Sequence, residues 1–90
     1  MAFTKEEAAT AARKDLAERL GVSETEISES VEDAEFPDMA LGAATKGEVS
    51  GQMITPGWRI SLKAMGKTFE YRANKHQLRL HNYKGRNYRV

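Results

Sequence analysis

The spacing of apolar residues changes once along this chain, near Ile27, and this change constrains the fold more than any other feature. Before Ile27, apolar residues recur every three or four positions, which is the period of an amphipathic helix. After it, apolar and polar residues alternate, which is the period of a strand with one buried face. The sequence therefore predicts one helix followed by a set of strands.

The helix is expected to span about residues 5–20. Thr4 and Glu7 have the spacing of a capping box, in which each side chain binds the backbone N–H of the other residue. Gly21 stands where a left-handed C-terminal cap is favoured. A second capping box at 23–26 is followed only by Ile27, so it predicts one turn at most. The apolar stripe of the helix is Ala8, Ala9, Ala12, Leu16 and Leu20.

The rest of the chain is expected to form strands joined by turns. Val31–Phe36 is the first strand, and residues 38–48, which contain two glycines and show no period, are predicted to be a loop. Residues 49–55 are expected to form a strand that ends in a type II turn at Pro56-Gly57. In such a turn proline fixes φ at the first corner, and glycine accepts a positive φ at the second. Further strands are expected at 58–64, at 68–73 and around Leu78 and Leu80.

Short turns between consecutive strands make those strands antiparallel, and the single apolar stripe of the helix has only the sheet to cover. The expected fold class is α+β, with one N-terminal helix packed on an antiparallel β-meander of about four strands. Residues 1–82 form this single domain, and the pattern then fades into a polar, basic C-terminal tail at 83–90, whose order the sequence leaves open. The predicted core joins Ala12, Leu16 and Leu20 to Trp58, Ile60, Leu62, Phe69, Tyr71 and Leu78.

Charge is distributed unevenly along the chain, although the net charge is only +1. Residues 1–48 contain 5 Lys or Arg and 12 Asp or Glu, a balance of −7. Residues 49–90 contain 9 Lys or Arg and a single acid, Glu70, a balance of +8. This asymmetry raises the question of an acidic partner for the second half.

Several classes of protein are disfavoured by composition. The chain has no cysteine, which excludes disulfides and thiolate zinc sites. No apolar run is long enough to span a membrane, so we expect no membrane partner. The start of the chain carries Glu6 and Glu7 where a secretory signal would be basic and then apolar, and we therefore expect a cytoplasmic protein.

Three short motifs follow one another along the chain: Phe36-Pro37-Asp38-x-x-Leu41-Gly42, Thr55-Pro56-Gly57-Trp58-x-Ile60 and Phe69-x-Tyr71. Together with the end of the helix, they resemble a small bacterial domain family of uncharacterised function that is often found behind lipoprotein signals. That family reads Trp-Pro-Asp-x-x-Leu-Gly-Cys, then Thr-Pro-Gly-Tyr-x-Ile, then Tyr-x-Tyr-His. The likeness covers about residues 15–73. The order of helix and meander is also similar, more weakly, to PepSY-type domains.

The chain departs from that family at four positions. Phe36, Ala43, Trp58 and Arg72 stand where the family has tryptophan, cysteine, tyrosine and histidine. This chain therefore cannot perform any chemistry for which the family uses that cysteine or histidine. The resemblance supports the fold and implies no activity.

Catalytic and metal-binding patterns are weak. The sequence has neither a Gly-x-Ser-x-Gly motif nor a cysteine nucleophile. His76 and His81 are five residues apart and would point to opposite faces of a strand, with basic residues around them instead of further metal ligands. The acids at Glu24, Glu26 and 32–35 are typical of a solvated face. We therefore expect that the protein is not an enzyme and that it binds neither a cofactor nor a metal.

Two non-catalytic functions fit the sequence better. The first is a module that binds another protein, of unknown identity, through the long loop and the turn after it, because methionines make adaptable apolar surfaces. The alternative interpretation of Met39 and Met53 is that they fill the core. The residues expected to bind a protein partner are Asp38, Met39, Leu41, Thr55 and Pro56.

The second function is weak, sequence-indifferent binding of nucleic acid by the basic half. No acid follows Glu70, and Tyr71, Tyr83 and Tyr88 lie among the cations as surfaces on which bases could stack. The alternative interpretation is a basic face that balances the acidic half, or a solvated tail. The residues expected to contact phosphates are Arg72, Lys75, Arg79, Lys84, Arg86 and Arg89.

Overall fold

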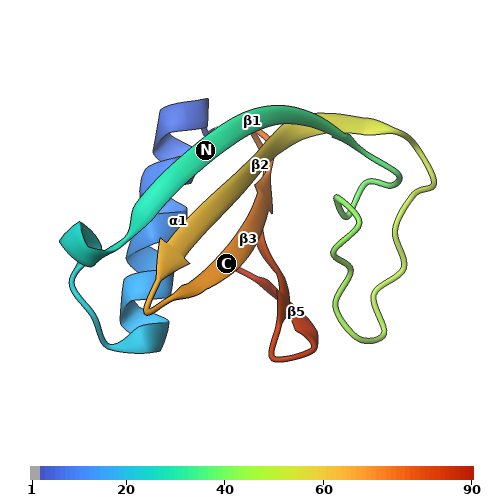
Figure 1. Cartoon of the computed structure of the whole chain (residues 1–90). Coiled ribbons are helices and arrows are strands. Elements are labelled where there is room, and N and C mark those ends of the chain that lie inside the picture. Colours follow the sequence, from blue (N-terminus) through green and yellow to red (C-terminus); the bar gives the residue numbers. More distant parts are fainter. Residues whose placement is uncertain (1–2) are drawn as a thin grey trace.

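One helix lies against a five-stranded antiparallel sheet in the computed structural model, which describes residues 3–90 (Figure 1). The strand order in the sheet follows the chain, so each strand pairs with the next one. The predicted α+β class is confirmed, with five strands instead of about four. The elements are α1 (Lys5–Leu20), a 3₁₀ turn (Glu24–Glu26), β1 (Ser28–Phe36), β2 (Thr55–Ala64), β3 (Lys67–Ala73), β4 (Leu78–Tyr83) and β5 (Arg86–Arg89).

Helix α1 begins and ends where the sequence predicts. The Glu7 backbone N–H donates to Thr4 Oγ1 at 3.1 Å, and the Thr4 backbone N–H donates to the Glu7 carboxylate at 2.8 Å. Gly21 has a φ of 69° and donates its N–H to the Ala17 carbonyl. The second capping box, at 23–26, forms a single 3₁₀ turn as expected.

The helix buries its apolar stripe against one face of the sheet. Tyr71, the largest fully buried side chain, donates its hydroxyl to the Asp15 carboxylate at 2.6 Å. Burial and then this hydrogen bond raise the pKa of the Tyr71 phenol. Trp58 is only half-buried at the rim of the core, so its prediction as a core residue holds in part. The buried core on this face comprises Ala8, Ala12, Leu16, Ala17, Ile27, Ile60, Leu62, Ala64, Tyr71, Ala73, Leu78 and Leu80.

The prediction of a strand at residues 49–55 is wrong. The chain is irregular from Pro37 to Ile54, and β2 begins at Thr55 and continues through Pro56. Strand β3 pairs with β2 only from Trp58 onward, so Pro56 lies where β2 has a neighbour on one side alone. Strands tolerate proline at such positions.

The type II turn expected at Gly57 is also wrong, because Gly57 lies within β2 and does not have a positive φ. The glycine is required for a different reason. A Cβ built on Gly57 would lie 2.3 Å from the carbonyl oxygen of Ala73 and 3.2 Å from the ring of Phe36. The absent side chain lets β2 approach these neighbours.

The polar tail expected at 83–90 is instead part of the sheet, because residues 86–89 form the edge strand β5. Lys84 and Gly85 have φ values of 52° and 82°, and Tyr83 pairs with Arg86 across them. Two consecutive residues with positive φ make the type I′ turn that suits a two-residue hairpin loop. The sheet therefore extends beyond residue 82.

The long loop covers the sheet face opposite α1. Figure 1 shows the helix on one side of the sheet and the loop on the other. Strand residues that alternate with the core side chains point toward this loop, among them Arg72 and Arg79, which bond to its carbonyl groups. Beneath the loop, Phe36, Ala40, Leu41 and Ala43 form a second buried apolar group.

Candidate functional site

The loop between β1 and β2 is the most unusual feature of the fold. Residues 37–54 contain no helix and no strand, although most connections in small domains are only a few residues long. Long irregular segments in compact domains are commonly functional. The loop has two parts of different character, a docked segment (residues 38–48) and an apolar segment (residues 49–54).

The docked segment begins with a turn built around Asp38. Its Oδ1 accepts hydrogen bonds from the backbone N–H of Ala40 at 2.9 Å and of Gly42 at 3.0 Å. Leu41 and Gly42 then take the left-handed conformation, with φ values of 59° and 64°. This turn directs the Leu41 side chain into the protein, where it is fully buried.

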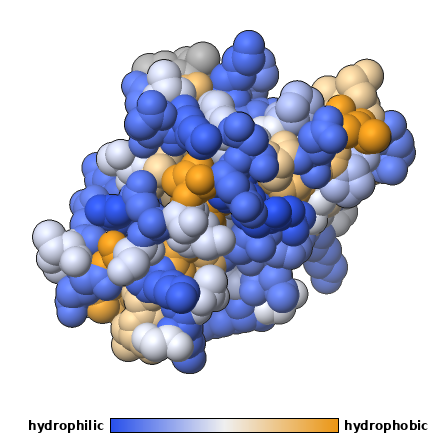
Figure 2. Space-filling view, turned by 45° about the horizontal axis from the view of Figure 1, so that its top comes forward, coloured by the Kyte–Doolittle hydropathy of each residue, from blue (hydrophilic) through white to orange (hydrophobic). Residues whose placement is uncertain are grey.

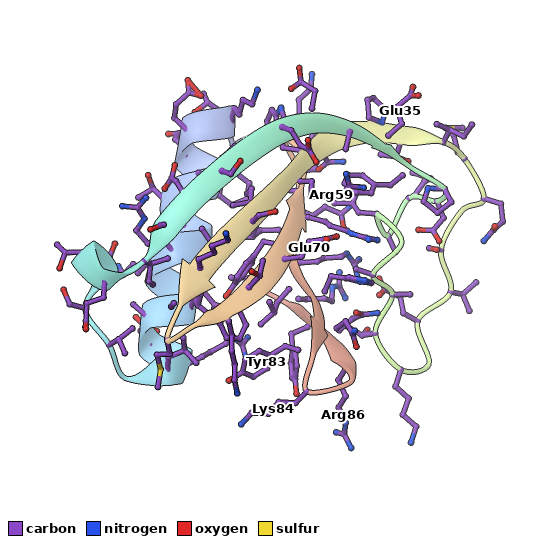
Figure 3. All side chains as sticks on the ribbon, in the orientation of Figure 1. Glu35, Arg59, Glu70, Tyr83, Lys84 and Arg86 are labelled. Carbon is purple, nitrogen blue, oxygen red and sulfur yellow. The ribbon has the colours of Figure 1, made fainter. Side chains whose placement is uncertain are left out.

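Arg72 on β3 fastens the middle of the docked segment to the sheet. Its Nη1 donates to the carbonyl oxygens of Leu41 at 3.0 Å and Gly42 at 3.1 Å. Its Nε donates to Glu70 at 2.6 Å, and the guanidinium lies 5.3 Å from the centre of the Phe36 ring. Figure 3 labels Glu70 on the sheet face that looks toward the loop. Arg72 is therefore a structural side chain of this face.

Arg79 on β4 fastens the end of the docked segment. Nη1 and Nη2 of Arg79 donate to the two carboxylate oxygens of Glu48 at 2.6 and 2.7 Å. Nε donates to Gln77 at 2.6 Å, and Nη1 also reaches the Ala43 carbonyl at 3.3 Å. Arg79 is only 3% exposed, so this guanidinium depends on its protein partners for solvation.

Glu48 is held ionised by this arrangement. The hydrogen bonds from Arg79, followed by one from the Thr45 backbone, lower the pKa of the Glu48 carboxyl to about 2. The Thr45 N–H donates to Oε1 at 2.9 Å, and its hydroxyl contacts the same oxygen at 3.2 Å. At neutral pH, Glu48 and Arg79 therefore lock residue 48 onto the sheet.

The apolar segment that follows is exposed to solvent. Val49, Met53 and Ile54 are 95%, 64% and 68% exposed, and the neighbouring Met39 is 50% exposed. The Met39 N–H donates to the Gly51 carbonyl at 2.9 Å, which ties the two parts of the loop together. Figure 2 shows hydrophobic surface on the side of the molecule where Figure 1 places the loop. Four large apolar side chains are thus presented to solvent by one loop.

The residues predicted to bind a protein partner are placed in different environments. Met39 and Pro56 are exposed. Asp38 is occupied by its turn, and Thr55 donates its hydroxyl to the Met53 carbonyl at 2.8 Å. Leu41 is fully buried, so its assignment to a binding surface is wrong. The interpretation of Met39 and Met53 as core residues is also wrong, since both side chains are exposed and neither belongs to the buried core.

The six cations predicted to contact phosphates do not form one surface. Arg72 and Arg79 are hydrogen-bonded to the loop, so their assignment to a phosphate-binding surface is wrong. Lys75 lies in the turn before β4, at the opposite end of that strand from the β4–β5 turn. The cations exposed at or beyond the end of β4 are Lys84, Arg86 and Arg89. Of the three tyrosines, Tyr71 is buried, and Tyr83 and Tyr88 are half-buried against the core.

Sequence reasoning missed Val49 and Ile54 as exposed apolar residues. Both belonged to the run expected to form a strand, where an apolar residue is normally assigned to a sheet. The signal against that strand was Gly51, because a glycine weakens a strand interior. It could have marked these side chains as part of the loop.

Titratable groups do not assemble a metal site in residues 3–90, where the structure has no group of three or more histidine, cysteine or acidic side chains able to hold an ion. His81 lies next to Glu70 in the sheet, and burial, followed by the charge of Arg72, lowers the pKa of its imidazole. In the same part of the chain, no helix is long and apolar enough to cross a membrane.

Comparison with known proteins identifies a family. Residues 9–81 match the model of a protein family described as a domain of unknown function, DUF8738. Neither a curated protein nor a solved structure matches the chain. The matched range contains the whole loop and both arginines that hold it, and it agrees with the resemblance to a family that has no assigned activity.

Proposed function

We propose that this chain, which belongs to the DUF8738 family, is a non-catalytic module that binds another protein through the apolar segment 49–54 and the adjacent Met39. The observation that carries this proposal is the exposure of Met39, Val49, Met53 and Ile54 on one loop. Scattered apolar residues are normal on protein surfaces, but a group of them on one loop commonly marks an interaction site.

The construction of the loop supports the proposal. Arg72 and Arg79 hold the docked segment against the sheet, and Asp38 fixes its first turn. The apolar segment therefore begins at a fixed position on the protein surface. A surface that is already positioned loses less conformational entropy on binding than a free chain does. The two methionines add flexible side chains that adapt to the shape of a partner.

The chemistry of the segment indicates the kind of partner. Residues 49–54 read Val-Ser-Gly-Gln-Met-Ile, with no charged side chain. A partner that receives them must offer an uncharged apolar groove, because an unpaired charge facing these side chains would lose its hydration. The proposed partner is therefore a protein with such a groove.

The proposal includes no catalytic activity. The polar side chains of the sheet face opposite α1 are largely occupied with one another, as in the contacts of Glu70 with Arg72 and of Arg59 with Glu32. Nucleic-acid binding by the whole basic half loses support, because two of its six cations are held internally. It remains an outcome that the experiment below can detect.

A capture experiment with photo-crosslinking tests the proposal. A photoreactive amino acid is placed at Gln52, and crosslinked proteins are recovered from nuclease-treated extract of the source cells. We expect a partner to be recovered when Met53 and Ile54 are present, and to be lost when the same protein carries Met53→Ser/Ile54→Ser. Met65→Ser is the matched control, because Met65 is 70% exposed on a different turn.

The partner is then purified and its affinity for the two variants is measured. A loss of at least about tenfold with Met53→Ser/Ile54→Ser and no loss with Met65→Ser supports the proposal. Equal binding by both variants contradicts it. Recovery of a partner only when nuclease is omitted would assign the function to the basic half of the chain instead.

A further inference from the structure

A second feature, separate from the loop, is a hollow at the end of the molecule where α1 finishes. It lies between the last turn of α1, the β2–β3 turn and the β4–β5 hairpin, and its volume is about 560 Å³. Figure 1 shows these three parts meeting at the same end of the molecule. The volume is within the range of about 300–1,000 Å³ that is usual for small-molecule sites. We call it the basic hollow.

The charged groups of the basic hollow are all positive. Arg19, Lys67 and Lys84 contribute to its lining, and no acidic side chain does. Within residues 3–90, neither lysine has a carboxylate at ion-pair distance; Arg19 has Asp15, which binds its Nε at 2.7 Å. Like charges that converge on one space repel each other, and an anion placed among them relieves this repulsion.

Aromatic rings form the wall beside these cations. Phe69 and Tyr83 line the hollow, with ring centres 5.9 Å apart. The Lys84 ammonium lies 5.4 Å from the centre of the Tyr83 ring, and Figure 3 labels both residues on the β4–β5 hairpin. The Arg19 guanidinium lies 4.7 Å from the Tyr88 ring, so it is positioned by the same hairpin. The hollow therefore combines aromatic surface with cations.

We propose that the basic hollow binds a nucleotide, with the base against the aromatic wall and the phosphate among Arg19, Lys67 and Lys84. A planar ring stacks on aromatic side chains whatever its sequence context. Lysine and arginine are the usual ligands of phosphate oxygens. Free nucleotides and the nucleotides of a single strand share this chemistry, and the experiment separates them. The site is independent of the protein-binding loop proposed above.

The test is an NMR titration of the full chain that follows the backbone amides. The probes are adenosine monophosphate, adenosine, inorganic phosphate and a short single-stranded RNA. We expect adenosine monophosphate to shift the amides of Lys67, Phe69 and Lys84, and to bind more tightly than adenosine or inorganic phosphate. The contribution of base stacking is measured by comparing adenosine monophosphate with inorganic phosphate. Substitution of Phe69 or Tyr83 is not used, because both side chains also pack against the core.

The protein variants test the cations. Lys67→Gln/Lys84→Gln is expected to weaken binding of adenosine monophosphate by about tenfold. Lys63→Gln/Lys75→Gln removes the same charge from exposed positions outside the hollow and is expected to change affinity little. Dispersed spectra of both variants show that they remain folded.

The outcomes divide as follows. Shifts by both the mononucleotide and the RNA at the same amides assign the hollow to a nucleotide in either form, and shifts by the mononucleotide alone assign it to a free nucleotide. The proposal is overturned if the mononucleotide causes no shifts at the hollow, if inorganic phosphate binds as tightly as the mononucleotide, or if both double variants lose affinity equally.

Discussion

Replacing Glu48 with glutamine tests whether one ion pair holds the loop to the sheet. In the native protein, the Arg79 guanidinium is nearly inaccessible and donates to both carboxylate oxygens of Glu48. Glutamine preserves the size of the side chain but removes its charge and one acceptor. The Arg79 cation then remains buried without a counter-charge, which is the costly situation for a group removed from water.

The magnitude follows from the pKa of Glu48. The pKa falls from 4.5 to about 2 in the folded protein, and each pKa unit corresponds to about 1.4 kcal/mol of interaction with the charged form. The full difference is therefore about 3 kcal/mol. The side chain is 17% exposed, so solvent screens part of this interaction, and we expect Glu48→Gln to lower the free energy of unfolding by about 2–3 kcal/mol.

The same reasoning gives a pH dependence with a definite sign. Because folding lowers the pKa of Glu48, its contribution is present above the unfolded pKa, near pH 4.5, and is lost as the pH falls toward 2. Between pH 6 and pH 3 the native protein is expected to lose about 2 kcal/mol through this group. The glutamine variant has no such contribution to lose, so the difference between the two proteins should narrow.

Urea unfolding at pH 6 and pH 3, followed by the fluorescence of Trp58, measures both quantities. Glu35→Gln is the control, since Glu35 is an exposed acid on β1 whose removal should have little effect at either pH. The reasoning is refuted if Glu48→Gln destabilises the protein no more than Glu35→Gln, or if its effect is the same at both pH values. A domain of this size has only about 3–5 kcal/mol of stability, so unfolding curves are needed in place of a single-point assay.

Two further substitutions and one deletion probe the fold. Gly57→Ala should lower the free energy of unfolding by about 2 kcal/mol or more, because its Cβ would lie 2.3 Å from the Ala73 carbonyl oxygen; equal thermal midpoints for the two proteins would contradict this. Tyr71→Phe removes the hydrogen bond to Asp15 from the core and should cost about 1–2 kcal/mol by urea unfolding, with no measurable change as the contrary result. Deleting residues 84–90 removes strand β5 and should abolish the dispersed NMR spectrum of the folded protein, whereas a preserved spectrum would show that the strand is dispensable.

Much of the local structure was decided by the sequence alone. The capping box at Thr4, the apolar stripe and Gly21 place both ends of α1, because they involve residues close together in the chain. The change of period near Ile27 predicts the change from helix to strands for the same reason. The alternation in β2 and β3 predicts which strand residues face the helix, and therefore most of the core.

The positions where the prediction failed depend on contacts between distant segments. Pro56-Gly57 has the composition of a turn, but pairing with β1 extends the chain there, and the Ala73 carbonyl explains the glycine. Residues 86–89 carry one apolar side chain, Tyr88, which packs only because β4 lies beside it. A four-residue edge strand has too short a pattern to be recognised without its neighbour.

The candidate site shows the same division most clearly. The sequence marks the loop as long and irregular and supplies its methionines, but it does not distinguish an arginine that contacts phosphate from one that contacts a carbonyl group. Arg79 and Glu48 are far apart in the chain, and only the folding of the loop onto the sheet brings Arg79 Nη1 to 2.6 Å from Glu48 Oε1. Composition and period therefore determined the helix, the strands and the basic half, whereas the tertiary structure decided which cations are buried, because burial depends on what lies opposite each side chain.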